Sequence, residues 1–174
     1  MNISRTEIMD GVALNYLQSF KFKTACMSVS MLTQLSRETA AMNALIPFVL
    51  RRGTVGYPDM DAVSARLDEL YGTAVEPLVR RMGEIQCIGS FASFPEGQFL
   101  PDNQDVLRDT AGLIGQFLLS PNTKGGLFLP EYVNSERDKM LDTIRARVNN
   151  KRSYAAVRCI EEMCCYEDFA VGPL

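Results

Sequence analysis

The sequence of 174 residues contains no histidine. This absence excludes Ser/His and Cys/His nucleophilic sites, all histidine-ligated zinc sites and imidazole acid–base catalysis. No apolar run approaches the roughly 18 residues of a membrane-spanning helix, and the opening residues MNISRTEIMD are too polar for a secretory signal. We therefore expect a cytoplasmic protein with no membrane partner.

The sequence also lacks a concentrated basic face. Its 18 basic and 21 acidic residues give a formal net charge of −3. The basic residues are scattered along the chain, apart from two arginine pairs and a short cluster near residue 150. Nucleic-acid binding requires the neutralisation of many phosphates by one basic surface, so we expect no nucleic-acid partner.

The five cysteines do not have the spacing of a metal site. Cys159 and Cys164 are five residues apart and Cys164 adjoins Cys165, which fits neither a CxxC zinc motif nor an easy disulfide. An odd number of cysteines without an export signal predicts reduced thiols. We expect most of them to be buried, with a reactive surface thiol at Cys165 as the alternative; the full set is Cys26, Cys87, Cys159, Cys164 and Cys165.

The hydrophobic content of 47% is sufficient for one sizeable core. Residues 11–19 and 24–33 alternate between apolar and polar or small side chains, which predicts two strands paired as a hairpin. Residues 74–81 and 84–94 predict a second antiparallel pair. Apolar periodicity and cap residues predict helices over 36–52, 59–72, from about 103 to 119, 130–148 and 153–165.

This order of elements predicts an α+β domain, with a largely antiparallel sheet and helices packed on one face. We expect residues 1–174 to form a single domain. The sequence ends in DFAVGPL after a helix, without a closing strand. We therefore interpret the chain as a domain that lacks its C-terminal part.

Three segments, in this order and spacing, resemble the first domain of the insulinase, pitrilysin and mitochondrial-processing-peptidase family of zinc peptidases. They are NALIPFVLRRGT at 43–54, LDELYGTAVE at 67–76 and the block SERDKMLDTIRARVNNKRSYAAVRCIEEMC at 135–164. The resemblance covers residues 22–172 and is greatest to a bacterial branch with degenerate catalytic motifs. It implies the metallopeptidase α/β fold of that family.

Active members of this family carry the motif His-x-x-Glu-His shortly before a Gly-Thr. Aligning the Gly-Thr with Gly53 and Thr54 places Ala44 and Phe48 at the two histidines and Pro47 at the glutamate that serves as the base. The resemblance therefore implies that the first two zinc ligands and the base are absent. The proline costs a helical hydrogen bond, and we expect it to lie at a kink in a helix that has become part of the core.

The third zinc ligand of the family is a glutamate seven residues after a Glu-Arg pair. Counting from Glu136 and Arg137 gives Thr143, which has no carboxylate, with Asp142 beside it. A single carboxylate would hold zinc weakly, because catalytic zinc sites use three protein ligands. We therefore expect no zinc and no other cofactor.

The resemblance implies a non-catalytic homologue that acts as a partner or substrate-holding subunit, paired with a catalytic homologue or with a second domain of the same family. One alternative is a zinc metallopeptidase with rearranged ligands that include Glu136 and Asp142. Another is a freestanding module that binds unstructured peptides.

Two features are candidates for peptide binding. The pairs Arg51/Arg52 and Arg80/Arg81 could clamp a peptide carboxylate, because guanidinium groups match carboxylates in a bidentate manner. The alternative is that they are solvated ends of a helix and a strand. The long strand IQCIGSFASF, residues 85–94, is the second candidate, since an edge strand of the resembling family adds extended substrate to the sheet.

Overall fold

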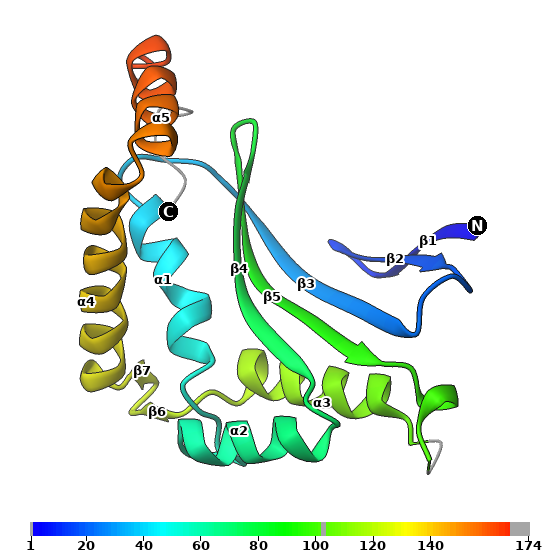
Figure 1. Ribbon diagram of the computed structural model, residues 1–174. Coiled ribbons are helices and arrows are strands. Elements are labelled where there is room, and N and C mark those ends of the chain that lie inside the picture. Colours follow the sequence, from blue (N-terminus) through cyan, green and yellow to red (C-terminus); the bar gives the residue numbers. More distant parts are fainter. Residues whose placement is uncertain (1, 102–103, 168–174) are drawn as a thin grey trace.

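The computed structural model describes residues 2–101 and 104–167 (Figure 1). The expected end without a closing strand, at DFAVGPL, lies outside the described residues. The strands are β1 (Asn2–Met9), β2 (Val12–Gln18), β3 (Thr24–Gln34), β4 (Ala74–Met82), β5 (Ile85–Pro95), β6 (Thr123–Lys124) and β7 (Leu127–Phe128). The α-helices are α1 (Ala40–Leu50), α2 (Met60–Glu69), α3 (Val106–Leu119), α4 (Pro130–Ala146) and α5 (Lys151–Met163).

The main sheet has three antiparallel strands in the order β3-β5-β4. The predicted pairing of the segments 74–81 and 84–94 is confirmed, since β4 and β5 form a hairpin that turns at Gly83. β3 pairs with β5 along its whole length, from Thr24 opposite Pro95 to Gln34 opposite Ile85. β5 is therefore the central strand, paired on both sides.

The predicted hairpin between residues 11–19 and 24–33 is wrong. β2 pairs instead with β1, a strand that the sequence analysis did not predict, while β3 pairs with β5. The turn between Met9 and Val12 has two residues, Asp10 and Gly11, and Gly11 has a φ of 75°. An Asp-Gly turn of this length strongly favours a hairpin, because glycine tolerates the left-handed region that the turn requires.

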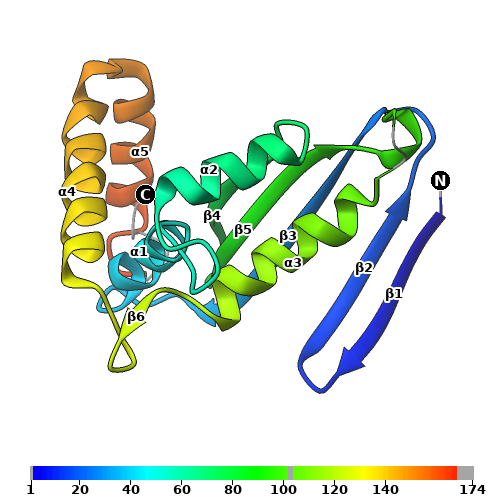
Figure 2. The same cartoon turned by 90° about the horizontal axis from the view of Figure 1, so that it is seen from below.

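The helices cover one face of the main sheet, which confirms the α+β fold with helices on one side (Figure 2). α2 and α3 pack on this face, where their buried side chains share one core with Val75 of β4 and with Ala92 and Phe94 of β5. The largest fully buried side chains include Phe117, Leu70 and Ile114. The core cluster consists of Val63, Leu67, Leu70, Val75, Ala92, Phe94, Val106, Leu113, Ile114 and Phe117.

Helix boundaries differ from the predicted ones by a few residues, as is usual where caps and turns compete. α1 begins at Ala40, because residues after Ser36 form a turn in which its Oγ accepts from the Glu38 N–H. α3 begins after Asp105, whose side chain caps it. α5 begins after the cap residue Asn150, before the predicted start at Ser153.

The last helix, α5, lies at the edge of the molecule and none of its residues is buried. It continues from α4 through a short 3₁₀ turn, Arg147–Asn149. Beyond it, Arg37 donates from Nη2 to the carbonyl oxygens of Cys165 at 2.6 Å and Glu167 at 2.9 Å. One side chain before α1 therefore holds the end of α5.

The expectation of mostly buried cysteines is wrong, although all five are free thiols. Cys87 on β5 is buried and Cys164 is half-buried, whereas Cys26, Cys159 and Cys165 are exposed. Cys159 is exposed because it lies on α5, a helix in which no residue is buried.

Candidate functional site

Helix α1, which carries the positions of the degenerate motif, lies between the sheet and α4 (Figure 1). It contacts β4, β5 and α4. Ala44 is 0% exposed and Pro47 is also fully buried. Phe48 is only half-buried, so the expectation that all three positions belong to the core is correct for two of them and wrong for Phe48.

Pro47 is accommodated inside α1 without interrupting it. Proline has no N–H to donate to the carbonyl four residues earlier, at Asn43. The helix continues beyond it, and Pro47 accepts from the Arg51 N–H at 3.2 Å. α1 is tied to the sheet near its start by Gln86 on β5, which donates to the Ala40 carbonyl at 2.9 Å and accepts from Asn43 Nδ2 at 3.2 Å. Contacts on the N-terminal side of the proline therefore tie the helix to the sheet.

A group of charged and aromatic side chains, which we call the Arg52 cluster, joins the end of α1 to α4. Arg52 Nη1 lies 3.1 Å from Glu136 Oε1, and Lys139 Nζ lies 2.9 Å from the same oxygen. The Arg52 guanidinium also lies over the ring of Tyr132, at 5.1 Å from its centroid. The Tyr132 hydroxyl donates to the Pro58 carbonyl at 3.1 Å. Glu136, buried to 8% exposure, is therefore neutralised by two cations.

The residues at the third ligand position point to solvent. Thr143 is exposed and its hydroxyl donates to the Lys139 carbonyl at 2.9 Å. Asp142 is paired with Arg145 at 3.3 Å, and 76% of its side chain is exposed. Glu136 and Asp142 are six residues apart on α4, which separates them by about 9 Å along the axis and by about 120° around it. The two carboxylates do not converge on one point.

These positions do not fit a zinc ion. Ala44, Pro47 and Phe48 offer no side-chain donor atom, and the Thr143 hydroxyl is not among the thiolate, imidazole and carboxylate groups that bind zinc. Within residues 2–101 and 104–167, no group of three or more cysteine, aspartate or glutamate side chains is placed to hold a metal ion. The zinc chemistry of the resembling family therefore has no ligands at this position.

The two arginine pairs lie at opposite ends of α1. Arg51 and Arg52 follow its last turn, whereas Arg80 and Arg81 lie opposite Cys87 and Gln86, level with its start. An eleven-residue helix is about 16 Å long, so the pairs do not form one clamp. Side chains alternate along a strand, so Arg80 and Arg81 point to opposite faces of the sheet. Arg80 is exposed on the face that carries no helix.

The prediction that residues 85–94 form a substrate-binding edge strand is wrong in its location. β5 has β3 on one side and β4 on the other, so its backbone groups are already paired. The edges of the main sheet are β3 and β4. β4 is the edge nearer to α1 (Figure 1).

Comparison with known proteins gives a metallopeptidase-like relative of this chain. No family model matches the chain. Over 161 residues it is 31% identical to a protein of Bacillus subtilis (strain 168) described as "Probable inactive metalloprotease YmfF". The matched region covers 92% of this chain and 38% of the relative. The chain is thus a homologue of a metallopeptidase-like protein that is itself described as inactive, and it spans well under half of that relative's length.

A solved structure has the same fold. The crystal structure of a conserved protein from Enterococcus faecalis V583 matches 99% of this chain and 40% of its own length, with a TM-score of 0.87 and 23% sequence identity.

None of the described helices is long and apolar enough to cross a membrane.

The residues that hold α1 in place were not predicted from the sequence. Gln86 was included in a predicted strand, without any signal that its amide would be buried against a helix. Glu136 was identified as part of a Glu-Arg pair and as a ligand in the alternative of a rearranged zinc site. Its partners are instead Arg52 and Lys139, whereas the adjacent Arg137 pairs with Asp138.

Proposed function

We propose that this chain is a non-catalytic homologue of the insulinase-type zinc peptidases, which serves as a partner or substrate-holding subunit in a peptidase-like assembly. The observation that carries the proposal is the composition of α1. Alanine, proline and phenylalanine occupy the positions at which the resembling family has two zinc ligands and a general base. Without a metal or base, the helix retains only its packing role against the sheet and α4.

The Arg52 cluster supports the same proposal. A carboxylate beside a zinc site must be available to the ion or to one of its ligands. Glu136 instead accepts from Arg52 and Lys139 at a single oxygen. The described contacts of Glu136 therefore hold α1 and α4 together, and the oxygen that makes them is already paired with two cations.

The partner in this proposal is a catalytic homologue or a second domain of the same family, and the ligand is an unstructured peptide. The face of the main sheet without helices would line the shared chamber, since it leaves Arg80 exposed. We also propose a cytoplasmic location. Both relatives are longer than this chain, so these roles concern an assembly of which the chain is one part.

Metal analysis and a peptidase assay test the loss of catalysis. The purified chain, incubated with zinc and then dialysed, is expected to retain far less than one zinc ion per chain and to leave a quenched fluorescent peptide uncleaved. Stoichiometric zinc that resists dialysis, or cleavage that a chelator abolishes, would contradict the proposal and favour an enzyme with rearranged ligands.

Peptide binding is tested by fluorescence anisotropy with a labelled, unstructured acidic peptide. We expect binding without cleavage, and weaker binding by Arg80→Gln. The matched control is Arg108→Gln, which removes an exposed arginine from α3 on the other side of the sheet. Equal binding by both variants would exclude the Arg80 face as the peptide site.

A further inference from the structure

The two edges of the main sheet differ in the protection that they carry. Exposed edge strands usually contain charged residues or proline, which prevent another chain from pairing with them. β4 follows this rule, with Glu76, Pro77, Arg80 and Arg81. β3 has the sequence TACMSVSMLTQ, without a charge or a proline in eleven residues.

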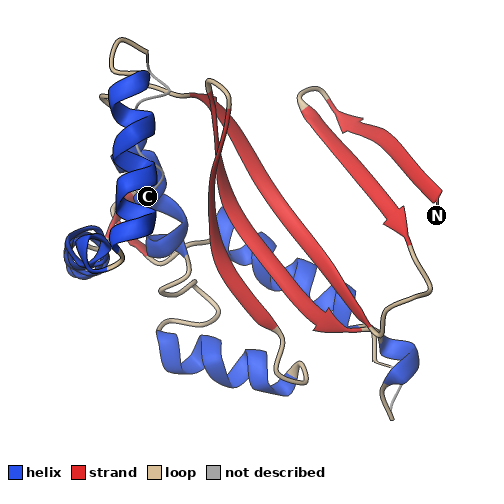
Figure 3. Ribbon diagram, turned by 45° about the horizontal axis from the view of Figure 1, so that its top comes forward, coloured by secondary structure: helices blue, strands red, loops and turns tan. Residues whose placement is uncertain are grey.

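The outer edge of β3 is unpaired in the described part of the chain. Its ladder partner is β5 on the inner side, and the main sheet ends at β3. The β1–β2 hairpin lies beside this edge but forms a separate two-stranded sheet (Figure 3). In the described part of the chain, this eleven-residue strand therefore has no strand partner on the side that faces the hairpin.

The hairpin itself exposes apolar side chains on both faces. Ile3 is 77% exposed, and Leu14, Tyr16 and Leu17 are each about half exposed. Phe20, in the segment that leads from the hairpin to β3, is 86% exposed. Isolated two-stranded hairpins are marginally stable in water, and an apolar surface of this kind usually marks an interface.

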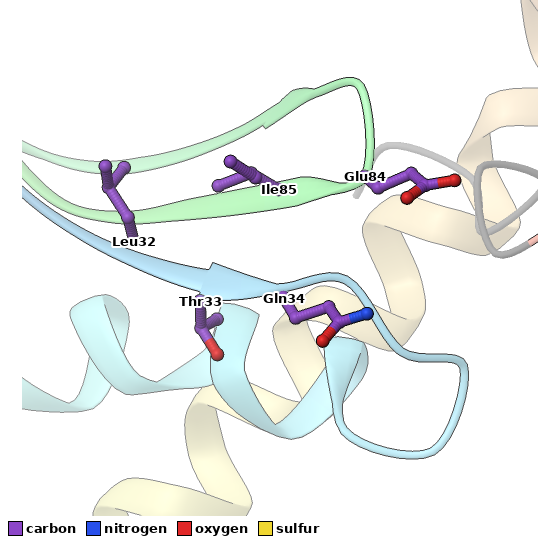
Figure 4. Close-up of a pocket in the computed structure, with 5 residues that line it drawn as sticks. All are labelled: Leu32, Thr33, Gln34, Glu84 and Ile85. Atoms are coloured by element: carbon purple, nitrogen blue, oxygen red, sulfur yellow. The ribbon is translucent and has the colours of Figure 1, made fainter.

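The apolar surface continues at the far end of β3. Leu32 is 67% exposed and lies near Ile85, at the start of β5, which is 45% exposed. These two residues line an open depression together with Thr33, Gln34 and Glu84 (Figure 4). Exposed apolar side chains thus lie beside the unprotected edge, on the hairpin, and at the far end of β3.

We propose that the outer edge of β3, together with the hairpin beside it, binds an extended polypeptide strand rich in uncharged and apolar residues. Its source is the portion of the longer metallopeptidase-like relative that this chain does not span, since the chain covers only 38% of that relative. Backbone hydrogen bonds to β3 supply the affinity and the apolar side chains supply the register. This inference does not depend on the loss of zinc, because β3 lies on the side of the sheet away from α1.

Hydrogen exchange during fragment complementation tests the proposal. The chain is mixed with a separately produced polypeptide that comprises the part of the Bacillus relative outside the matched region. Light scattering is expected to show a one-to-one complex, and exchange of the amides of residues 24–34 should slow by at least about tenfold.

Leu32→Lys and Met82→Lys form a matched pair of variants. Both side chains are 67% exposed, but Leu32 lies on the β3 edge and Met82 on the β4 edge. Leu32→Lys is expected to weaken the complex by at least about tenfold, because a charge on an edge opposes strand addition, whereas Met82→Lys should change it by less than about twofold.

Four results would overturn the proposal. They are the failure of a complex to form, a complex that leaves exchange in β3 unchanged, equal weakening by the two lysine variants, and self-association of the chain alone that protects β3 to the same degree. The last result would show that a second copy, rather than the remainder of such a protein, is the occupant.

Discussion

Replacement of Arg52 by alanine should substantially lower the free energy of unfolding, because this side chain links α1 to α4 in two ways. It donates a charge-assisted hydrogen bond to Glu136, whose side chain is 9% exposed, and such bonds contribute about 1.5–3 kcal/mol. Its guanidinium also lies over Tyr132, which adds about 0.5–1 kcal/mol. The sum is about 2–4 kcal/mol.

Two features keep the loss within this range. Lys139 remains paired with Glu136 in the variant, so the buried carboxylate is not left without a cation. The loss therefore stays near or below the 3–5 kcal/mol that is typical when a buried ion pair loses its only partner. Arg52 Nε is buried and has no hydrogen-bond partner among the described residues, which already reduces the net contribution of the side chain.

Urea denaturation followed by circular dichroism measures the effect. Arg52→Ala is expected to lower the urea concentration at the unfolding midpoint. In thermal unfolding it should reduce Tm by roughly 5–15 °C for a chain of this length. The control Lys139→Ala removes the other cation, whose side chain is 61% exposed, and should cost at most about 1 kcal/mol. A double-mutant cycle of Arg52→Ala with Glu136→Gln should give a coupling of at least about 1 kcal/mol.

A stability of Arg52→Ala within about 0.5 kcal/mol of the parent protein would contradict this role of Arg52. Equal destabilisation by the Arg52 and Lys139 variants would also refute it. Either result would mean that the packing of α1 on the sheet, and not the Arg52 cluster, determines how strongly α1 and α4 are held together.

Three further predictions concern α1 and the glycines. The double variant Ala44→His/Phe48→His should bind no stoichiometric zinc in metal analysis. In denaturation its free energy of unfolding should fall by about 1–3 kcal/mol, because histidine overpacks position 44. Recovered peptidase activity would contradict this prediction. Phe48→Ala should cost about 1–3 kcal/mol in urea denaturation, below the 3–5 kcal/mol of a fully buried phenylalanine, and a cost above that range would show that Phe48 is buried in solution. Gly89→Ala should strongly destabilise the sheet in thermal unfolding, because the added Cβ would lie 1.9 Å from the Val29 carbonyl oxygen. Gly112→Ala, whose added Cβ would have no heavy atom within 4 Å, should instead stabilise α3 by about 0.5–1 kcal/mol. Similar effects at the two sites would contradict the packing of β3 on β5.

The type and order of most elements could be predicted from the sequence, because periodicity is a local property. The α2 and α3 helices and the β4–β5 hairpin follow from apolar spacing, caps and a glycine turn within a few residues. The pairing of β3 could not be predicted in this way. Its partner, β5, lies about 60 residues further along the chain, and a nearer strand, β2, had an equally suitable pattern.

The candidate site was predictable in its residues but not in its contacts. Aligning the degenerate motif on Gly53 and Thr54 identified the positions on α1, and the structure places two of the three in the core. Whether Phe48 is covered depends on what packs over α1, which one sequence does not specify. The link between Arg52 and Glu136 joins residues 84 positions apart, so no local pattern could indicate it.

The attachment of α5 through Arg37 implies two levels of stability in this chain. The helix buries no side chain, and its end is held by one guanidinium that donates to two carbonyl oxygens. Opening of α5 therefore exposes little apolar surface, and it can occur while the sheet and the helices that pack on it stay folded. Displacement of Arg37 from those carbonyls would remove the long-range hydrogen bonds at the end of α5 while leaving the core contacts unchanged.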